Sequence, residues 1–218
     1  MQKNQKNTTA KERMLKKIRQ ALLQKREHPF PAFEDQPLYP AYEDSLAVLF
    51  AQELTQVKGH FVFCEDELQL VEQLVILAEQ EKWAQLYVWE KPIQKVLDSV
   101  GFPYMSTDEG FEGAQVGITG CEALIARTGS VLLSNAGPSG RRLSVYPPVH
   151  VVIARSSQLV LDMSEGLKKL QERYKTLLPS MISVVTGPSR TADIEKTLVL
   201  GAHGPKSFYV FLIDDAAY

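Results

Sequence analysis

The stretch "HFVFCEDELQLVEQLVILAEQEKWAQLYVWEKPIQKVLDSV", residues 60–100, decides the fold class. Two short apolar runs, at 60–64 and 86–89, are each followed by a segment with apolar residues at helical spacing, at 66–83 and 91–100. Alternating strands and helices at this spacing are typical of a mainly parallel sheet covered by helices. The sequence therefore predicts an α/β fold.

Upstream of this unit the pattern is helical, then extended, then helical again. Residues 9–27 read as a basic amphipathic helix, with Thr9 and Glu12 spaced as a capping box. Residues 28–40 contain four prolines and form an extended connector. A further amphipathic helix is expected over 43–57. We therefore predict an N-terminal helical arm and connector at 1–40 and one α/β domain at 41–218.

Downstream of Gly101 the pattern becomes more antiparallel. The runs "ALIAR" and "SVLLS" flank Thr128-Gly129, which indicates a β-hairpin inserted into the fold. Further strands are expected at 150–154, at "ISVVTG" and at "FYVFLID". A helix is expected over 164–177, with Leu167, Leu170 and Tyr174 facing the core.

Composition narrows the class of protein. The 218 residues are 44% hydrophobic and 23% charged, an ordinary profile for a globular protein. No stretch approaches the roughly 20 apolar residues of a membrane helix, and no signal-peptide pattern opens the chain, so we expect a cytoplasmic protein. The usual fingerprints of P-loop enzymes, dinucleotide-binding enzymes and zinc proteases are missing from the sequence.

Two cysteines, Cys64 and Cys121, cannot supply the four thiolates that an iron–sulfur cluster usually takes. We therefore expect no cofactor bound by this chain alone, and we assign no metal ligands.

Charge is distributed unevenly along the chain. Residues 1–28 hold nine Lys/Arg and two acids, a net of +7, so the remaining residues carry −9 of the total of −2. A basic arm on an acidic body suits an acidic partner, an acidic lipid surface, its own body or a second copy of the chain. The last of these would give a homo-oligomer through the N-terminal helix. Nucleic acid is disfavoured because residues 1–28 contain no aromatic side chain for stacking.

The first candidate site is "TGPSRTADIE", residues 186–195, which follows an apolar strand. Ligands in open α/β sheets bind at the carboxyl ends of strands. Ser189, Arg190 and Thr191 are candidate ligand-binding residues, because a guanidinium and hydroxyls suit a carboxylate or phosphate. Asp193 and Glu195 are candidate catalytic residues. A capped turn with a surface salt bridge explains the same stretch equally well.

Two further clusters carry polar side chains beside glycines. Arg141 and Arg142 follow a Gly-Pro-Ser-Gly turn and form either an anion cradle or a solvated basic loop. Glu122 and Thr128 flank the hairpin strand "ALIAR" and are candidate ligand-binding residues, although Glu122 could instead form an ion pair with Arg127.

Two histidines complete the set of candidates. His203, in "AHGP", is the candidate for proton transfer, or a hydrogen-bonded loop residue. His150 opens a strand, where a structural role is favoured. We expect residues 186–195, Arg141, Arg142 and His203 to meet at one edge of the sheet.

In this order, "GITGCEALIARTGSVLLS", "RRLSVYPPVHVVIA" and "TGPSRTADIEKTLVLGAHGP" resemble the lactate utilization protein C family, the LUD-domain proteins. The resemblance covers roughly residues 40–215. It implies a fold like those of ribose-5-phosphate isomerase and CoA transferases, and a role in bacterial oxidation of L-lactate to pyruvate. It also implies partner proteins, at least one of which carries iron–sulfur clusters.

One residue departs from the pattern expected for the family. Arg127 stands where an acid is expected before Thr128-Gly129, which puts a catalytic or metal role at this position in doubt. Two functions remain open. The chain is either a component of a lactate-oxidising system that binds a small carboxylate or phosphate, or a stand-alone enzyme acting on a sugar phosphate or acyl-CoA.

Overall fold

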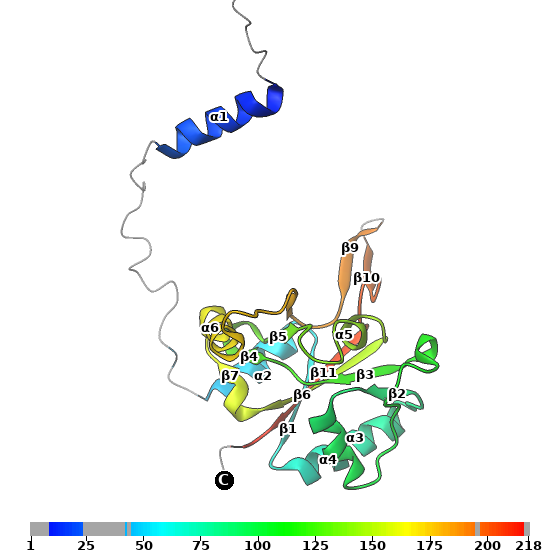
Figure 1. The fold of residues 1–218 in the computed structure, drawn as a ribbon. Coiled ribbons are helices and arrows are strands. Elements are labelled where there is room, and N and C mark those ends of the chain that lie inside the picture. The colour runs from blue at the N-terminus through cyan, green and yellow to red at the C-terminus, as the bar shows by residue number, and fades with distance from the viewer. Residues whose placement is uncertain (1–8, 24–41, 43–44, 195–196, 216–218) are drawn as a thin grey trace, which may run out of the picture. The chain divides into compact units, whose positions relative to one another are not determined.

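The computed structural model describes residues 9–23, 42, 45–194 and 197–215 (Figure 1). The chain divides into two compact units, residues 1–43 and residues 44–218. No described helix is long and apolar enough to cross a membrane.

The first unit contains helix α1, Ala10–Leu23. The predicted capping box is confirmed: the Glu12 carboxylate accepts from the Thr9 N–H at 2.8 Å, and the Thr9 hydroxyl accepts from the Glu12 N–H at 3.3 Å. Every described side chain of α1 is exposed. The rest of the predicted helix, 24–27, and the proline connector lie outside the described residues.

The second unit is built on a five-stranded sheet in the order β1-β11-β6-β3-β2. All four strand pairs are parallel, which confirms the mainly parallel sheet. The strands are β1 (His60–Cys64), β2 (Leu86–Val88), β3 (Val116–Thr119), β6 (Val149–Arg155) and β11 (Ser207–Ile213). The last strand of the chain, β11, therefore lies between β1 and β6 near the middle of the sheet.

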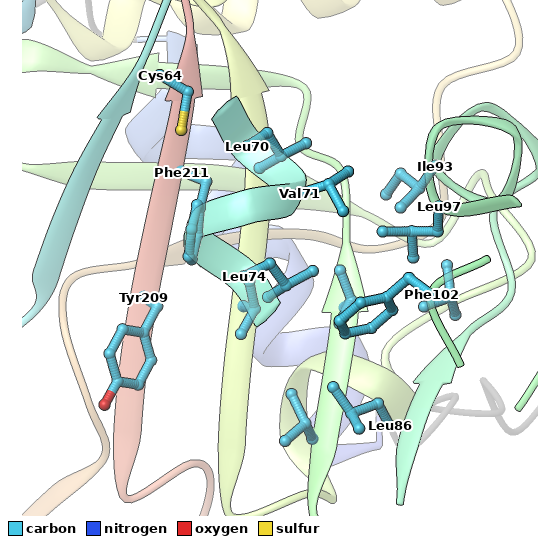
Figure 2. Close-up of a cluster of buried hydrophobic side chains, with 14 of the residues drawn as sticks. Cys64, Leu70, Val71, Leu74, Leu86, Ile93, Leu97, Phe102, Tyr209 and Phe211 are labelled. Atoms are coloured by element: carbon cyan, nitrogen blue, oxygen red, sulfur yellow. The ribbon is translucent and has the colours of Figure 1, made fainter. Parts of the chain in front are cut away.

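One face of this sheet is covered by α3, Glu67–Gln80, and α4, Lys91–Asp98. Figure 2 shows Leu70, Val71 and Leu74 of α3 together with Tyr209 and Phe211 of β11. The Asp66 side chain caps α3 by accepting from the Gln69 N–H at 2.8 Å. Both helices start within one residue of the predicted positions and end two or three residues earlier.

The other face packs against α2, Leu46–Gln56, and a second sheet of order β7-β4-β5-β8. Phe208, Val210 and Leu212 point to this side, because side chains alternate along a strand. The members of the second sheet are β4 (Ala123–Ile125), β5 (Ser130–Ser134), β7 (Leu159–Val160) and β8 (Ile182–Val185). The core of the second unit thus fills the space on both sides of the parallel sheet.

Helix α6, Met163–Tyr174, covers the outer side of the second sheet. Leu170 is buried there as predicted, whereas Leu167 is 39% exposed, so its predicted place in the core is wrong.

The predicted hairpin is confirmed: β4 and β5 pair antiparallel, joined by a short 3-10 helix at Ala126–Thr128. Gly129 has a positive φ of 57°, and a Cβ atom there would lie 2.3 Å from the Leu54 backbone nitrogen. Only glycine fits this turn, because α2 packs directly on it.

Several elements were not predicted as separate units. The segment after β8 forms a second antiparallel hairpin, β9 (Arg190–Ile194) and β10 (Thr197–Leu200), which projects from the body in Figure 1. A short helix, α5 (Arg142–Val145), packs on β3, where a Cβ at Gly117 would lie 2.1 Å from the Leu143 carbonyl oxygen. Two further 3-10 turns span Phe111–Gly113 and Ser156–Gln158.

Candidate functional site

The start of the motif, around Ser189, lies at the edge where the parallel strands begin. The Ser189 N–H donates to the Pro205 carbonyl at 2.8 Å, and the Gly201 N–H donates to the Ser189 carbonyl at 2.9 Å. Because β11 starts at Ser207, these bonds hold the base of the β9–β10 hairpin at the amino edge of the sheet.

The candidate residues of this motif and of the following turn are mostly exposed. Arg190 and His203 are exposed, and Ser189 and Thr191 are half-buried. Asp193 belongs to β9, and Glu195 lies outside the described residues. The roles that we assigned to these side chains stay predictions.

Thr128 and the start of the same motif meet beside α2. The Thr128 and Ser130 hydroxyls are 2.7 Å apart, and the Ser130 and Thr186 hydroxyls are 2.8 Å apart. Gly187 has a φ of 74°, and a Cβ there would lie 2.5 Å from the Val57 carbonyl oxygen. This chain of hydroxyls joins the hairpin turn to the end of β8, and the two glycines let both segments pack on α2.

Arg141 and Arg142 are both exposed at the start of α5. The Arg142 guanidinium lies 3.4 Å from the Asp108 carboxylate and sits over the rings of Phe111 and Trp89, at 4.6 and 5.2 Å from their centroids. Its charge is therefore already engaged by an acid and two aromatic rings.

A cavity of about 570 Å³ opens at the opposite, carboxyl edge of the parallel sheet. We call it the carboxyl-edge cavity. Residues that follow β2, β3 and β6 line it, together with the start of α4, the 137–140 loop and the end of α6. Its polar lining includes Glu90, Lys91, Thr119, Glu122, Ser134, Ser139, Arg155, Gln158, Arg173 and Tyr174. Its apolar lining includes Leu70, Pro92, Ile93, Val96, Leu133, Ile153 and Ile213.

Glu122 is held by three donors within this cavity. Its carboxylate accepts from the Ser134 hydroxyl at 2.6 Å, the Tyr174 hydroxyl at 2.8 Å and the Arg173 guanidinium at 3.0 Å. Its side chain is 10% exposed, whereas that of Arg173 is 64% exposed. Burial, together with the bond to Glu122, raises the pKa of Tyr174, so its hydroxyl remains a donor at neutral pH. Arg173 therefore both neutralises a nearly buried carboxylate and presents a cation to solvent.

Glu90 faces the same cavity from the end of β2. One of its carboxylate oxygens accepts from the Gly120 N–H at 3.1 Å, and the other accepts from the Ser139 hydroxyl at 2.8 Å. Ser139 is buried, so this bond fixes the 137–140 loop against the start of α4.

Cys121 also lines the cavity. Burial, with Glu122 and Glu90 nearby, raises the pKa of its thiol well above the ordinary value. Because the thiolate is the nucleophile, this environment disfavours a catalytic role for Cys121. The Gln158 side-chain amide donates a hydrogen bond to the Cys121 carbonyl at 2.6 Å. Arg155, also in the cavity wall, forms a salt bridge with Glu67.

Of the residues predicted from the sequence as a site, the structure places Glu122 in this cavity. The predicted meeting of residues 186–195, Arg141, Arg142 and His203 stays a prediction. Ser189, Arg190 and His203 lie toward the other edge of the sheet, away from the cavity that contains Glu122. The physical reason is that β8, which precedes the motif, belongs to the second sheet and pairs antiparallel with β5. The rule for carboxyl ends applies to the parallel strands, and β8 is not one of them.

Glu90 was missed by the sequence reasoning, although a signal for it exists. It directly follows the apolar run "LYVW" and opens the next helix, so the same rule, applied to β2, would have selected it. In the part of the chain that the structure describes, no group of three or more His, Cys, Asp or Glu residues is placed to hold a metal ion.

Comparison with known proteins agrees with this architecture. A crystal structure of a DUF162 family protein from Deinococcus radiodurans matches with a TM-score of 0.57, covering 80% of this chain and 99% of that chain at 20% identity. This similarity shows the fold. The expected similarity to ribose-5-phosphate isomerase and CoA transferases stays a prediction.

Curated relatives match over a shorter segment. Lactate utilization protein C of Anoxybacillus flavithermus is 36% identical over 107 residues, 49% of this chain and 47% of the relative. Lactate utilization protein C of a Geobacillus species is 38% identical over 106 residues, 47% of this chain and 44% of the relative. These matches span about half the length of the curated relatives.

The sequence model of the LUD domain family matches residues 47–213, which include every described strand of both large sheets. The resemblance drawn from the sequence motifs is thereby confirmed, and the chain belongs to the LUD domain family.

Proposed function

We propose that this chain is a component of a bacterial lactate utilization system and that its carboxyl-edge cavity binds a small organic anion. The names of the relatives support the first part. The cavity supports the second, because it combines cations at Lys91 and Arg173 with hydroxyls and an apolar wall. The observation that carries the proposal is Arg173, which is anchored on Glu122 yet is 64% exposed.

Oxidation of L-lactate to pyruvate releases two electrons and two protons, so it requires an electron acceptor. We assign that acceptor to iron–sulfur partner proteins. Cys64 and Cys121 are two thiols where a cluster usually takes four, and burial raises the pKa of both. In this proposal the chain binds and orients the anion, and the partner receives the electrons.

The test is calorimetry of the purified chain against L-lactate, pyruvate, sugar phosphates and nucleotides. We expect saturable binding of L-lactate that weakens at least tenfold in Arg173→Ala, because a charge-assisted hydrogen bond is worth about 1.5–3 kcal/mol. Arg142→Ala is the matched control, since Arg142 is also an exposed arginine paired with an acid, but it is absent from the cavity lining.

The two arginine variants distinguish the two candidate locations. Loss of binding in Arg142→Ala with normal binding in Arg173→Ala would move the site to the loop that the sequence singled out. Turnover of a sugar phosphate or an acyl-CoA by the purified chain alone would replace this proposal with that of a stand-alone enzyme.

A further inference from the structure

The two carboxylates of the carboxyl-edge cavity differ in how their charge is balanced. Glu122 accepts three hydrogen bonds, one of them from the Arg173 guanidinium. Glu90 accepts one bond from a backbone N–H and one from a serine hydroxyl, and among the described residues it forms no salt bridge. Glu122 is therefore neutralised within the protein, whereas Glu90 brings an unpaired negative charge to the cavity.

Glu90 also keeps unused acceptor capacity. A carboxylate offers about four lone-pair positions, and Gly120 and Ser139 occupy one on each oxygen. Glu90 is the N-cap residue of α4, but its side chain makes no capping hydrogen bond to the helix. The remaining positions are free to accept a donor from a ligand, and the nearby helix N-terminus favours the negative charge.

The backbone around Glu90 is shaped for this close approach. A Cβ at Gly120 would lie 2.9 Å from the Glu90 carboxylate oxygen, closer than such atoms can pack. The φ of Gly120 is not in the left-handed region, so a Cβ there would be accommodated by a shift of the flexible Glu90 side chain rather than by a change of the backbone. Any larger residue would push the carboxylate away from the Gly120 N–H.

We propose that Glu90 accepts a hydrogen bond from the 2-hydroxyl of a 2-hydroxy acid and thereby makes the cavity selective for 2-hydroxy acids over the corresponding 2-oxo acids. This inference rests on the proposed function and deepens it. The carboxylate of the ligand is held by the cavity cations, Arg173 foremost, and its side chain faces the apolar wall formed by Ile93, Val96 and Ile213.

A 2-oxo acid lacks the donor that this arrangement requires. Its C2 oxygen only accepts hydrogen bonds, so it would oppose a carboxylate oxygen of Glu90. Sites built to bond a ligand hydroxyl discriminate against analogues without one. Here the cost is that two acceptor oxygens, one on Glu90 and one on the ligand, face each other with no proton between them. Selectivity thus follows from the chemistry of one side chain rather than from the size of the cavity.

The experiment compares L-lactate with pyruvate by calorimetry on the full chain. In the unaltered protein we expect lactate to bind at least tenfold more tightly, the effect of one hydrogen bond to a charged group. In Glu90→Gln the ratio should fall to about threefold or less, because the carboxamide can donate to the oxo group. Glu109→Gln removes an exposed carboxylate that does not line the cavity, so it should keep the full ratio.

A second variant, Gly120→Ala, keeps the charge of Glu90 but displaces its carboxylate. It should also reduce the ratio of lactate affinity to pyruvate affinity. Circular dichroism of both variants checks that they remain folded. Equal affinities for lactate and pyruvate in the unaltered protein would overturn this inference while leaving the proposed function intact. If neither anion binds, the proposed function fails and this inference fails with it.

Discussion

At the scale of single residues, burial strongly perturbs the ionisation of His150. It is fully buried in β6, and its Nε2 atom lies 2.9 Å from the Thr119 hydroxyl. Its Nδ1 atom has no hydrogen-bond partner among the described residues. Burial lowers the pKa of His150 to about 3, so the ring is neutral in the folded protein near neutral pH. This environment agrees with the structural role that was favoured for this histidine.

His150 should make stability depend on pH. The unfolded chain takes up a proton near pH 6.5, whereas the folded chain does so only near pH 3. The contribution of the neutral, buried His150 ring to the free energy of unfolding is therefore complete above pH 6.5, and it is lost as the pH falls toward 3. Between pH 7 and pH 5 the unaltered protein should lose about 2 kcal/mol more of its free energy of unfolding than His150→Gln. Urea unfolding at both pH values measures this difference, and parallel losses in the two proteins would contradict it.

At the scale of elements, α1 presents an unusual combination of side chains. Met14, Ile18 and Leu22 share one face of the helix and are 64%, 48% and 77% exposed. Lys16 lies on the opposite face, and the helix carries five Lys/Arg against one acid. Burying such a face would stabilise the protein by about 25 cal/mol for each Å² of apolar area removed from water. This cost favours association of α1 with a second copy of the chain or with a partner protein, as predicted from the sequence.

Removing the helix tests this association. Deletion of residues 1–28 should lower the molecular mass in solution to that of one chain, or abolish binding to the partner. Light scattering after gel filtration measures the first and a pull-down measures the second. Ile18→Asp should reproduce the effect because it places a charge on the apolar face, and Lys16→Ala should not. An unchanged mass together with unchanged partner binding would show that α1 is a solvated tail.

At the scale of the second unit, the two ends of the parallel sheet carry different chemistry. The carboxyl edge has the cavity with Glu90 and Glu122, and the amino edge has the base of the β9–β10 hairpin with exposed Arg190 and His203. A ligand in the cavity is therefore held by groups separate from those of the hairpin. If the hairpin also binds an anion or a partner, as the sequence predicts, it does so at a second location.

This separation predicts that growth and ligand affinity respond differently to mutation. In a strain that needs this gene for growth on lactate, Arg190→Ala and His203→Ala should slow growth while the affinity for L-lactate stays within about twofold. Thermal melts and protein levels must be normal for the comparison to hold. Normal growth of both variants would reduce the motif to a capped turn, and loss of lactate affinity would place the ligand at the hairpin instead of the cavity.

The local pattern of the sequence determined the elements and their class. Apolar residues at spacings of two and of three to four placed β1, α3, β2 and α4, because these periods follow from the geometry of each element. The capping box of α1 and the turn at Thr128-Gly129 were also readable, since a cap and a tight turn involve only neighbouring residues. The starts of α3 and α4 were predicted to within one residue, whereas their predicted C-terminal ends were too late by two or three residues.

Tertiary structure decided which elements meet. β11 inserts between β1 and β6, although 142 positions separate the end of β1 from its start, and no local period encodes that pairing. The same is true of the cavity, where Glu90, Gly120 and Ser139 come from three separate segments. The placement of "TGPSRTADIE" away from the cavity follows from β8 pairing in the second sheet. Burial of both faces of the parallel sheet sets these pairings, and that burial is a property of the whole fold rather than of any one stretch.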